Sequence, residues 1–78
     1  MQRFGEKLGM LRKRHRMTIM ELTAALGYTS YGYIHTLEKG KKKPTAELVL
    51  KVSQLFNVTT DQLLRDDLDL PDEDTEGS

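Results

Sequence analysis

The sequence predicts an all-α fold of five short helices in one small domain, and three observations support this prediction. Apolar residues recur three and four positions apart along most of the chain, as they do on one face of an α-helix. Thr18 and Thr59 each begin a capping box, in which a Glu or Gln follows three residues later. Gly27, Gly40 and Asn57 follow apolar stripes and suit the left-handed conformation that ends a helix. The length of 78 residues fits a single domain with a modest core.

The first helix is expected over residues 2–14, where Phe4, Leu8 and Leu11 recur at the i, i+4, i+7 spacing of a buried stripe. We expect its basic side chains to stay in solvent: Arg3, Lys7, Lys13 and Arg14. The helix ends in the run RKRHR, which suits the negative end of a helix dipole. The same run also suits contacts to phosphate groups, and the sequence leaves both interpretations open.

The second and third helices are expected on either side of a tight turn. The second begins at Thr18, with Glu21 completing its capping box, and ends at Gly27. Thr29 or Ser30 then caps the third helix. The small residues of the second helix allow another helix to cross it closely.

In the third helix, Ile34 and Leu37 are expected to point inward. The outward face carries hydrogen-bonding groups and almost no carboxylate: Tyr31, Gly32, His35, Thr36 and Lys39. Such a face is suited to reading another molecule. Gly40 ends the helix, and Lys41, Lys42 and Lys43 follow in a loop that suits either phosphate contacts or simple solvation.

The fourth helix is expected over residues 45–56, with Thr45 as its cap and Val49, Val52 and Phe56 facing the core. The fifth helix begins at Thr59, with Gln62 completing its capping box.

Composition excludes several classes of protein and site. The chain has no cysteine, and His15 and His35 are too far apart in sequence to form a metal-binding pair, so we expect no disulfide, metal site or cofactor. It has no glycine-rich phosphate loop and no catalytic constellation, so we expect a protein that is not an enzyme and has no small-molecule ligand. Apolar runs are too short to cross a membrane, which predicts a cytoplasmic protein with no membrane partner.

The neutral net charge hides a strong division along the chain. Residues 1–65 hold all 12 lysines and arginines but only five of the 12 acids, a net charge of +7, and residues 66–78 hold the other seven acids. We therefore expect an anion-binding domain over residues 1–65 and an acidic, disordered tail over residues 66–78. A charge pattern that serves only solubility is the alternative.

From Phe4 to about Leu64, the chain resembles the Xre/Cro-like, lambda-repressor-like helix-turn-helix family. The likeness rests on these residues in order: Phe4, Leu8, Leu11-Arg12, Thr18-x-x-Glu21-Leu22, Leu26-Gly27, Ile34-x-x-Leu37-Glu38-x-Gly40, Pro44 and Val58-Thr59-x-x-Gln62-Leu63. The resemblance implies a five-helix lambda-repressor-like DNA-binding domain with the helix-turn-helix at helices 2 and 3. It also implies an ion pair between Arg12 and Glu38 that ties the first helix to the third.

The resemblance implies that the third helix enters the major groove of double-stranded DNA. Base contacts are then expected from Tyr31, Gly32, His35 and Thr36. Phosphate contacts are expected from Arg14, Arg16, Thr18, Ser30, Tyr33, Lys39, Lys41, Lys42 and Lys43.

The chain departs from the family at several positions. Ile19 stands where the family usually has a glutamine that binds a phosphate, and Arg16 replaces a glycine that commonly ends the first helix. The turn GYTS is one residue longer than the usual GVS. Few bidentate base contacts are possible for a helix that carries tyrosines and glycine, so we expect modest base selectivity. Tyr28 and Tyr33 are each either core residues or surface residues, and Tyr31 is expected at the surface.

Two functions remain open. The first is a sequence-specific DNA-binding transcriptional regulator, expected to be a repressor that acts as a homodimer on a pseudo-palindrome. Its dimer contacts are expected among five leucines that equally suit core packing: Leu48, Leu55, Leu64, Leu68 and Leu70. The second is a protein-interaction module, or an antitoxin or restriction-system controller, that reuses the fold. Its binding surface is then either a patch of Ile19, Met20 and Tyr31, or the acidic tail as a mimic of DNA for a basic partner.

Overall fold

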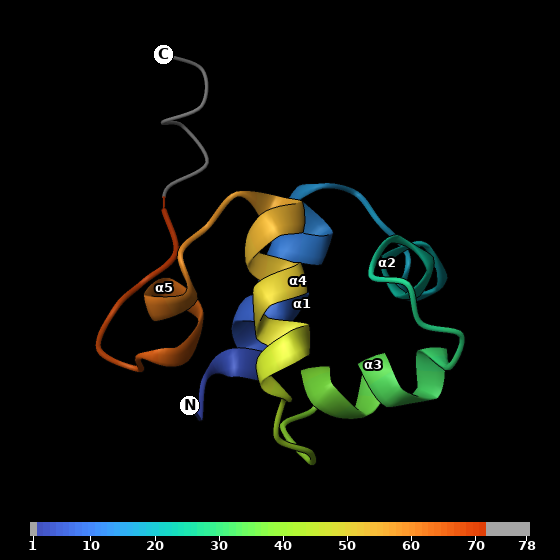
Figure 1. Ribbon diagram of the computed structural model, residues 1–78, viewed down its shortest axis with the longest axis horizontal. Helices are drawn as coiled ribbons and strands as arrows, with labels where there is room; N and C mark the ends of the chain where they lie inside the picture. Colours follow the sequence, from blue (N-terminus) through green and yellow to red (C-terminus); the bar gives the residue numbers. More distant parts are fainter. Residues whose placement is uncertain (1, 72–78) are drawn as a thin grey trace.

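Five α-helices make up the fold, as Figure 1 shows in the computed structural model, which describes residues 2–71. Their bounds are Phe4–Arg14 for α1, Ile19–Ala25 for α2, Tyr31–Glu38 for α3, Ala46–Phe56 for α4 and Thr60–Leu64 for α5. No strand occurs in the described residues. The all-α, five-helix prediction is therefore confirmed, with boundaries within two residues of those expected.

Helices α1 and α4 lie at the centre of the molecule, with α2 and α3 on one side and α5 on the other (Figure 1). Helix α1 contacts both α3 and α5, while α2 packs on α3 and α4 packs on α5. The apolar stripes of the helices meet in one core, whose fully buried members include Leu8, Leu22, Ile34, Leu37 and Leu63. This packing fixes the outer surface of α3 at the edge of the molecule, away from α5.

Side chains cap the N-terminal ends of α2, α3, α4 and α5 as the sequence predicts. The hydroxyls of Thr18 and Thr59 accept from backbone N–H groups three residues later, and both capping boxes are complete. Ser30, not Thr29, caps α3, and Thr45 caps α4. Asn57 ends α4 in the left-handed conformation, with φ 55°.

Arg16 adopts the same left-handed conformation, with φ 55°, at the point where the chain turns from α1 towards α2. The resemblance described above implies a glycine at this position. The backbone there is less favourable for arginine than for glycine, since a Cβ disfavours positive φ.

Gly5 lets α1 and α3 approach backbone to backbone. A Cβ at this position would collide with the carbonyl oxygen of Leu37 and lie too close to that of Glu38. Since these are backbone atoms, no side-chain rotation relieves the clash. Gly5 therefore sets how closely α1 crosses α3.

The expectation that Lys7 stays in solvent is wrong. Its side chain is fully buried, and its ammonium donates to the carbonyl oxygens of Gln62, Arg65 and Leu68 at 2.6, 2.8 and 2.6 Å. Burial lowers the pKa of the Lys7 ammonium below its ordinary value. Three carbonyl acceptors replace the water that a buried ammonium loses.

Residues 65–71, which we term the C-terminal strap, pack along α1. The Asp66 carboxylate accepts from the backbone N–H groups of Gln2 and Arg3 at 3.2 and 3.0 Å, next to the start of α1. The Arg3 guanidinium donates to the Asp66 carbonyl and the Asp69 carboxylate, and that of Arg14 donates to the Pro71 carbonyl at 2.7 Å.

The strap lies beyond residue 65, where the predicted domain boundary falls. Leu70 is buried in the core, and Arg3, Lys7 and Arg14 bind the strap from one stripe of α1. The folded unit therefore extends past residue 65 to Pro71. Residues 72–78 of the predicted acidic tail lie outside the described residues.

Asp66 makes stability depend on acid pH. Hydrogen bonds from the backbone N–H groups of Arg3 and Gln2 lower the pKa of Asp66 to about 2. Because this folded-state pKa lies below the unfolded value, the stabilisation is complete above about pH 4 and is lost as pH falls towards 2. Asp66→Asn should therefore lower the melting temperature at pH 6, with the difference from wild type shrinking by pH 2, as followed by circular dichroism.

Asp61→Asn is the matched control. Asp61 is exposed, and within residues 2–71 its carboxylate accepts no hydrogen bond from α1 or the strap. A wild-type advantage over Asp66→Asn that stays constant from pH 6 to pH 2 would contradict the role given to this carboxylate.

Candidate functional site

The outer face of α3 is exposed, as the sequence predicts. Ile34 and Leu37 are fully buried against the core, while Tyr31 is 55% exposed. Gly32 and His35 are also exposed, and Thr36 is half-buried. The side chains expected to read another molecule therefore lie at the surface.

Thr36 has already used its hydroxyl hydrogen. Its Oγ1 donates to the carbonyl oxygen of Gly32 at 2.8 Å, one turn earlier in α3. The lone pairs of the hydroxyl remain free to accept a hydrogen bond. Thr36 can thus recognise a donor on a partner and not a second acceptor.

The three tyrosines divide between core and surface. Tyr28 and Tyr33 are half-buried against the core and meet edge to face, with ring centroids 5.7 Å apart. Their outer ring faces are covered by cations, Lys51 over Tyr28 at 4.8 Å and Lys42 over Tyr33 at 5.5 Å. Tyr33 therefore packs against the core and stays partly exposed beside Lys42.

Lys41, Lys42 and Lys43, which we term the lysine loop, are exposed in the connection between α3 and α4. Gly40 begins this connection with φ 76°, the left-handed conformation that stops the helix. Within residues 2–71, none of the three lysines forms an ion pair. The loop therefore presents uncompensated positive charge beside the C-terminal end of α3.

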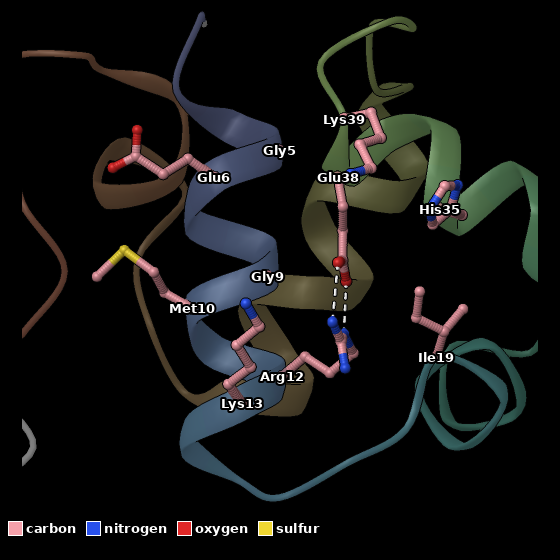
Figure 2. Close-up of a pocket in the computed structure, with 10 residues that line it drawn as sticks. All are labelled: Gly5, Glu6, Gly9, Met10, Arg12, Lys13, Ile19, His35, Glu38 and Lys39. Carbon is pink, nitrogen blue, oxygen red and sulfur yellow. Dashed lines mark hydrogen bonds and ion pairs between the residues drawn. The ribbon is translucent and has the colours of Figure 1, made fainter.

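A hollow of about 460 Å³ lies between α1 and α3 (Figure 2). The Arg12–Glu38 ion pair crosses it, with Arg12 donating to the two carboxylate oxygens at 2.8 and 3.1 Å. Arg12 also donates to the carbonyl of Met17 at 3.0 Å, and the bond to Glu38 raises the pKa of Arg12. Both side chains are mostly buried, so the predicted structural ion pair is confirmed.

Around this pair the hollow brings together Lys13 from α1, His35 from α3, Lys39 from the end of α3, and Ile19 from α2 (Figure 2). The sequence places Lys13 only on a wet face of α1 and does not connect it with His35. The crossing of α1 and α3 connects them, and that crossing depends on the close approach at Gly5. The run of basic residues at the end of α1 is the one sequence signal that pointed towards Lys13.

The remaining predicted phosphate contacts differ in their surroundings. Arg14 is half-buried and bound to the Pro71 carbonyl, so it serves the strap. Arg16 is exposed, whereas the hydroxyl of Thr18 already accepts from the backbone N–H of Glu21. Ser30 accepts from the backbone N–H of Tyr33 in the same way.

For the five leucines predicted at a dimer interface, the structure separates the two interpretations. Leu48 and Leu70 are buried in the core, so their side chains are not available to a second subunit, and the dimer prediction is wrong for them. Leu55 is 40% exposed, and Leu64 and Leu68 are half-buried. The predicted dimer contacts did not include Leu50, which is 54% exposed on α4.

Residues 2–71 contain no group of three or more His, Asp or Glu side chains placed to bind a metal ion. No helix within the same residues has the length and apolarity needed to cross a membrane.

Comparison with known proteins agrees with this arrangement. A family model described as a helix-turn-helix domain matches residues 3–67. A comparison with curated proteins gives no match.

Proposed function

The chain belongs to the helix-turn-helix domain family, and from this premise we propose that it is a sequence-specific, double-stranded DNA-binding transcriptional regulator that inserts α3 into the major groove. The observation that carries the proposal is the exposed, hydrogen-bonding face of α3 flanked by the lysine loop. We further propose that it represses transcription in the cytoplasm and is of the Xre/Cro-like kind. The five-helix order and the Arg12–Glu38 pair support that closer kinship.

The distribution of charge supports the proposed orientation on DNA. Glu38 is the only acid in α3, and it is neutralised by Arg12. The C-terminal strap, which contains Asp66, Asp67 and Asp69, lies on the side of α1 and α4 opposite to α2 and α3 (Figure 1). A duplex that approaches α3 therefore meets cations first, while the acidic end faces away.

Within this orientation, Tyr31, Gly32 and Thr36 face the bases. Lys39 and the lysine loop contact phosphates, with Arg16, Thr18, Ser30 and Tyr33 as further candidates at the edges of α2 and α3. Arg14 is left out of this set because it holds the strap. Few of the base-facing groups can make paired hydrogen bonds, so base selectivity should be modest and the electrostatic share of affinity large.

We propose a homodimer on DNA, because one domain with few base contacts binds weakly and a second domain adds affinity. Leu55, Leu64 and Leu68 carry this proposal, since they retain exposed surface.

A protein-interaction module is the second candidate. Met20 is 63% exposed and Tyr31 55% exposed, which favours an apolar contact at this end of the molecule. Ile19, the third member of the predicted patch, is half-buried against the core and contributes less.

Measurement of duplex affinity against salt separates the two candidates. The dissociation constant should rise steeply between 50 and 200 mM salt, with a log–log slope of several units, because lysines release counterions from DNA. Selection of bound duplexes from a random pool at fixed salt would then define the operator, and sedimentation of the complex its stoichiometry. Affinity that is flat with salt, or absent, would favour the protein-interaction module.

Thr36→Val is expected to change sequence preference and not general affinity. Valine keeps the shape of threonine but removes the hydroxyl, which in this structure can only accept from a base amino group such as adenine N6 or cytosine N4. One base position in the selected operator should lose about 0.5–1.5 kcal/mol of discrimination, the contribution of a single hydrogen bond. Thr36→Ser, which retains the hydroxyl, is the control, and equal selections by wild type and Thr36→Val would exclude this contact.

A further inference from the structure

The hollow between α1 and α3 is lined by groups suited to binding an anion, and we term it the anion seat (Figure 2). Lys13, His35 and Lys39 surround it, and its volume of about 460 Å³ far exceeds the roughly 30 Å³ of one water molecule. Resting on the function proposed above, we propose that this hollow seats one sugar–phosphate unit of the DNA backbone. In this arrangement His35 binds a phosphate, although the sequence placed it among the base contacts.

The acids that line the hollow do not oppose an anion. Glu38 is held by Arg12 at 2.8 Å, and Glu6 pairs with Arg3 at 3.4 Å. Figure 2 shows the Glu6 side chain extending from α1 away from α3. The carboxylates are therefore compensated or turned aside.

The two lysines of the hollow, by contrast, have no opposing charge among residues 2–71. Lys13 and Lys39 are exposed, and neither forms an ion pair within residues 2–71. Together they leave a net positive charge at the mouth, which phosphate, with a single negative charge per diester, can neutralise.

Ile19 supplies an apolar part of the lining of the hollow. Its side chain lines the hollow and packs against the core, so it offers an apolar wall and no hydrogen bond. An apolar wall suits the carbon atoms of deoxyribose. Lys13 on α1 and Lys39 at the end of α3 then supply the attraction for the phosphate.

His35 projects from α3 on the side that borders this hollow, one turn before Lys39 (Figure 2). A group that binds phosphate affects all sequences alike, whereas a group that binds a base edge affects one position of the operator. The two roles of His35 therefore give different results in one experiment.

The experiment compares Lys13→Gln, Lys39→Gln and His35→Gln with wild type on the selected operator and on an unrelated duplex of equal length. Each lysine variant should lower the log–log salt slope by about 1 and weaken both duplexes by roughly 5–10-fold at 100 mM salt. His35→Gln should weaken both duplexes by the same factor, leaving their ratio unchanged. Arg65→Gln is the control, because Arg65 pairs with Asp67 on the strap and should leave the slope unaltered.

Several outcomes would overturn the seat. A salt slope unchanged by Lys13→Gln would show that the DNA backbone does not enter the hollow. A ratio of operator affinity to unrelated-duplex affinity that shifts with His35→Gln would show that His35 contacts a base. If wild type itself binds without salt dependence, the proposed function fails instead, so the two failures are distinguishable. Thermal unfolding of each variant, expected near the wild-type value, excludes misfolding as the cause.

Free phosphate compounds share the chemistry of the DNA backbone, so a separate experiment tests whether they bind. Thymidine monophosphate and inorganic phosphate, titrated separately while amide NMR signals of Lys13 and His35 are followed, should bind only in the millimolar range. Saturation of those signals at micromolar concentration would overturn the DNA assignment in favour of a small-molecule effector.

Discussion

Replacing Lys7 with methionine should lower the melting temperature by roughly 10–25 °C. The change leaves the carbonyl oxygens of Gln62, Arg65 and Leu68 without their donor, in a site where the Lys7 side chain is fully buried. Loss of a buried charged donor with several acceptors destabilises a protein by about 3 kcal/mol or more. For a domain of this size, each kcal/mol shifts the melting temperature by about 4–8 °C.

Lys13→Met is the matched control, because it makes the same chemical change on the same helix at an exposed position. Its effect on stability should stay within about 0.5 kcal/mol. Thermal unfolding by circular dichroism compares the two variants directly. Equal melting temperatures for Lys7→Met and Lys13→Met would mean that, in solution, the Lys7 ammonium does not fix the strap to α1.

Amide exchange gives a second measure of the Lys7 role. Because Lys7 joins α1 to the end of α5 and to the strap, its loss should release the strap first. The amide of Leu68, which donates to the Arg65 carbonyl at 3.2 Å, should then exchange faster than the amides of α3.

Local signals explain why the helices could be predicted from the sequence. Thr18 and Thr59 bond to groups three residues away, and Asn57 takes its left-handed conformation within its own turn. Such interactions involve neighbouring residues, so the order of residue types contains them.

Lys7 and the strap show what a single sequence does not contain. The acceptors of Lys7 lie 55 to 61 residues further along the chain, and they are backbone carbonyls, which every residue has. Leu70 stands among aspartates, so its pattern resembled a solvated tail although its side chain is buried. Only the packing of the chain brings these groups together.

The candidate site divides in the same way. The outward face of α3 follows from the inward spacing of Ile34 and Leu37, which is a local pattern. The hollow beside it depends on how α1 crosses α3. That crossing is set by Gly5, and a lone glycine in a helix carries no sequence signal for the partner helix it touches.

The lysine loop should contribute more to DNA affinity than any other single element. Changing Lys41, Lys42 and Lys43 together to glutamine should lower the log–log salt slope by about 2–3 and weaken binding by roughly 10²–10³-fold at 100 mM salt. The lower value of the slope change allows for Lys42, which lies over the Tyr33 ring, 5.5 Å from its centroid, and is partly engaged there. Gel shifts from 50 to 200 mM salt on the operator and an unrelated duplex measure both quantities.

The change in salt slope should depend on where a lysine lies, and not only on how many lysines are removed. Lys51→Gln removes one cation on α4 that pairs with Glu47 at 3.2 Å and lies over Tyr28, so it should lower the slope by much less than one unit. Lys41→Gln removes one cation that has no such partner within residues 2–71, and should lower it by about 1. Both duplexes should weaken in parallel, because phosphates carry no sequence information. A triple variant that changed the operator ratio, or a Lys51 variant as weak as Lys41→Gln, would place the DNA on another face of the molecule.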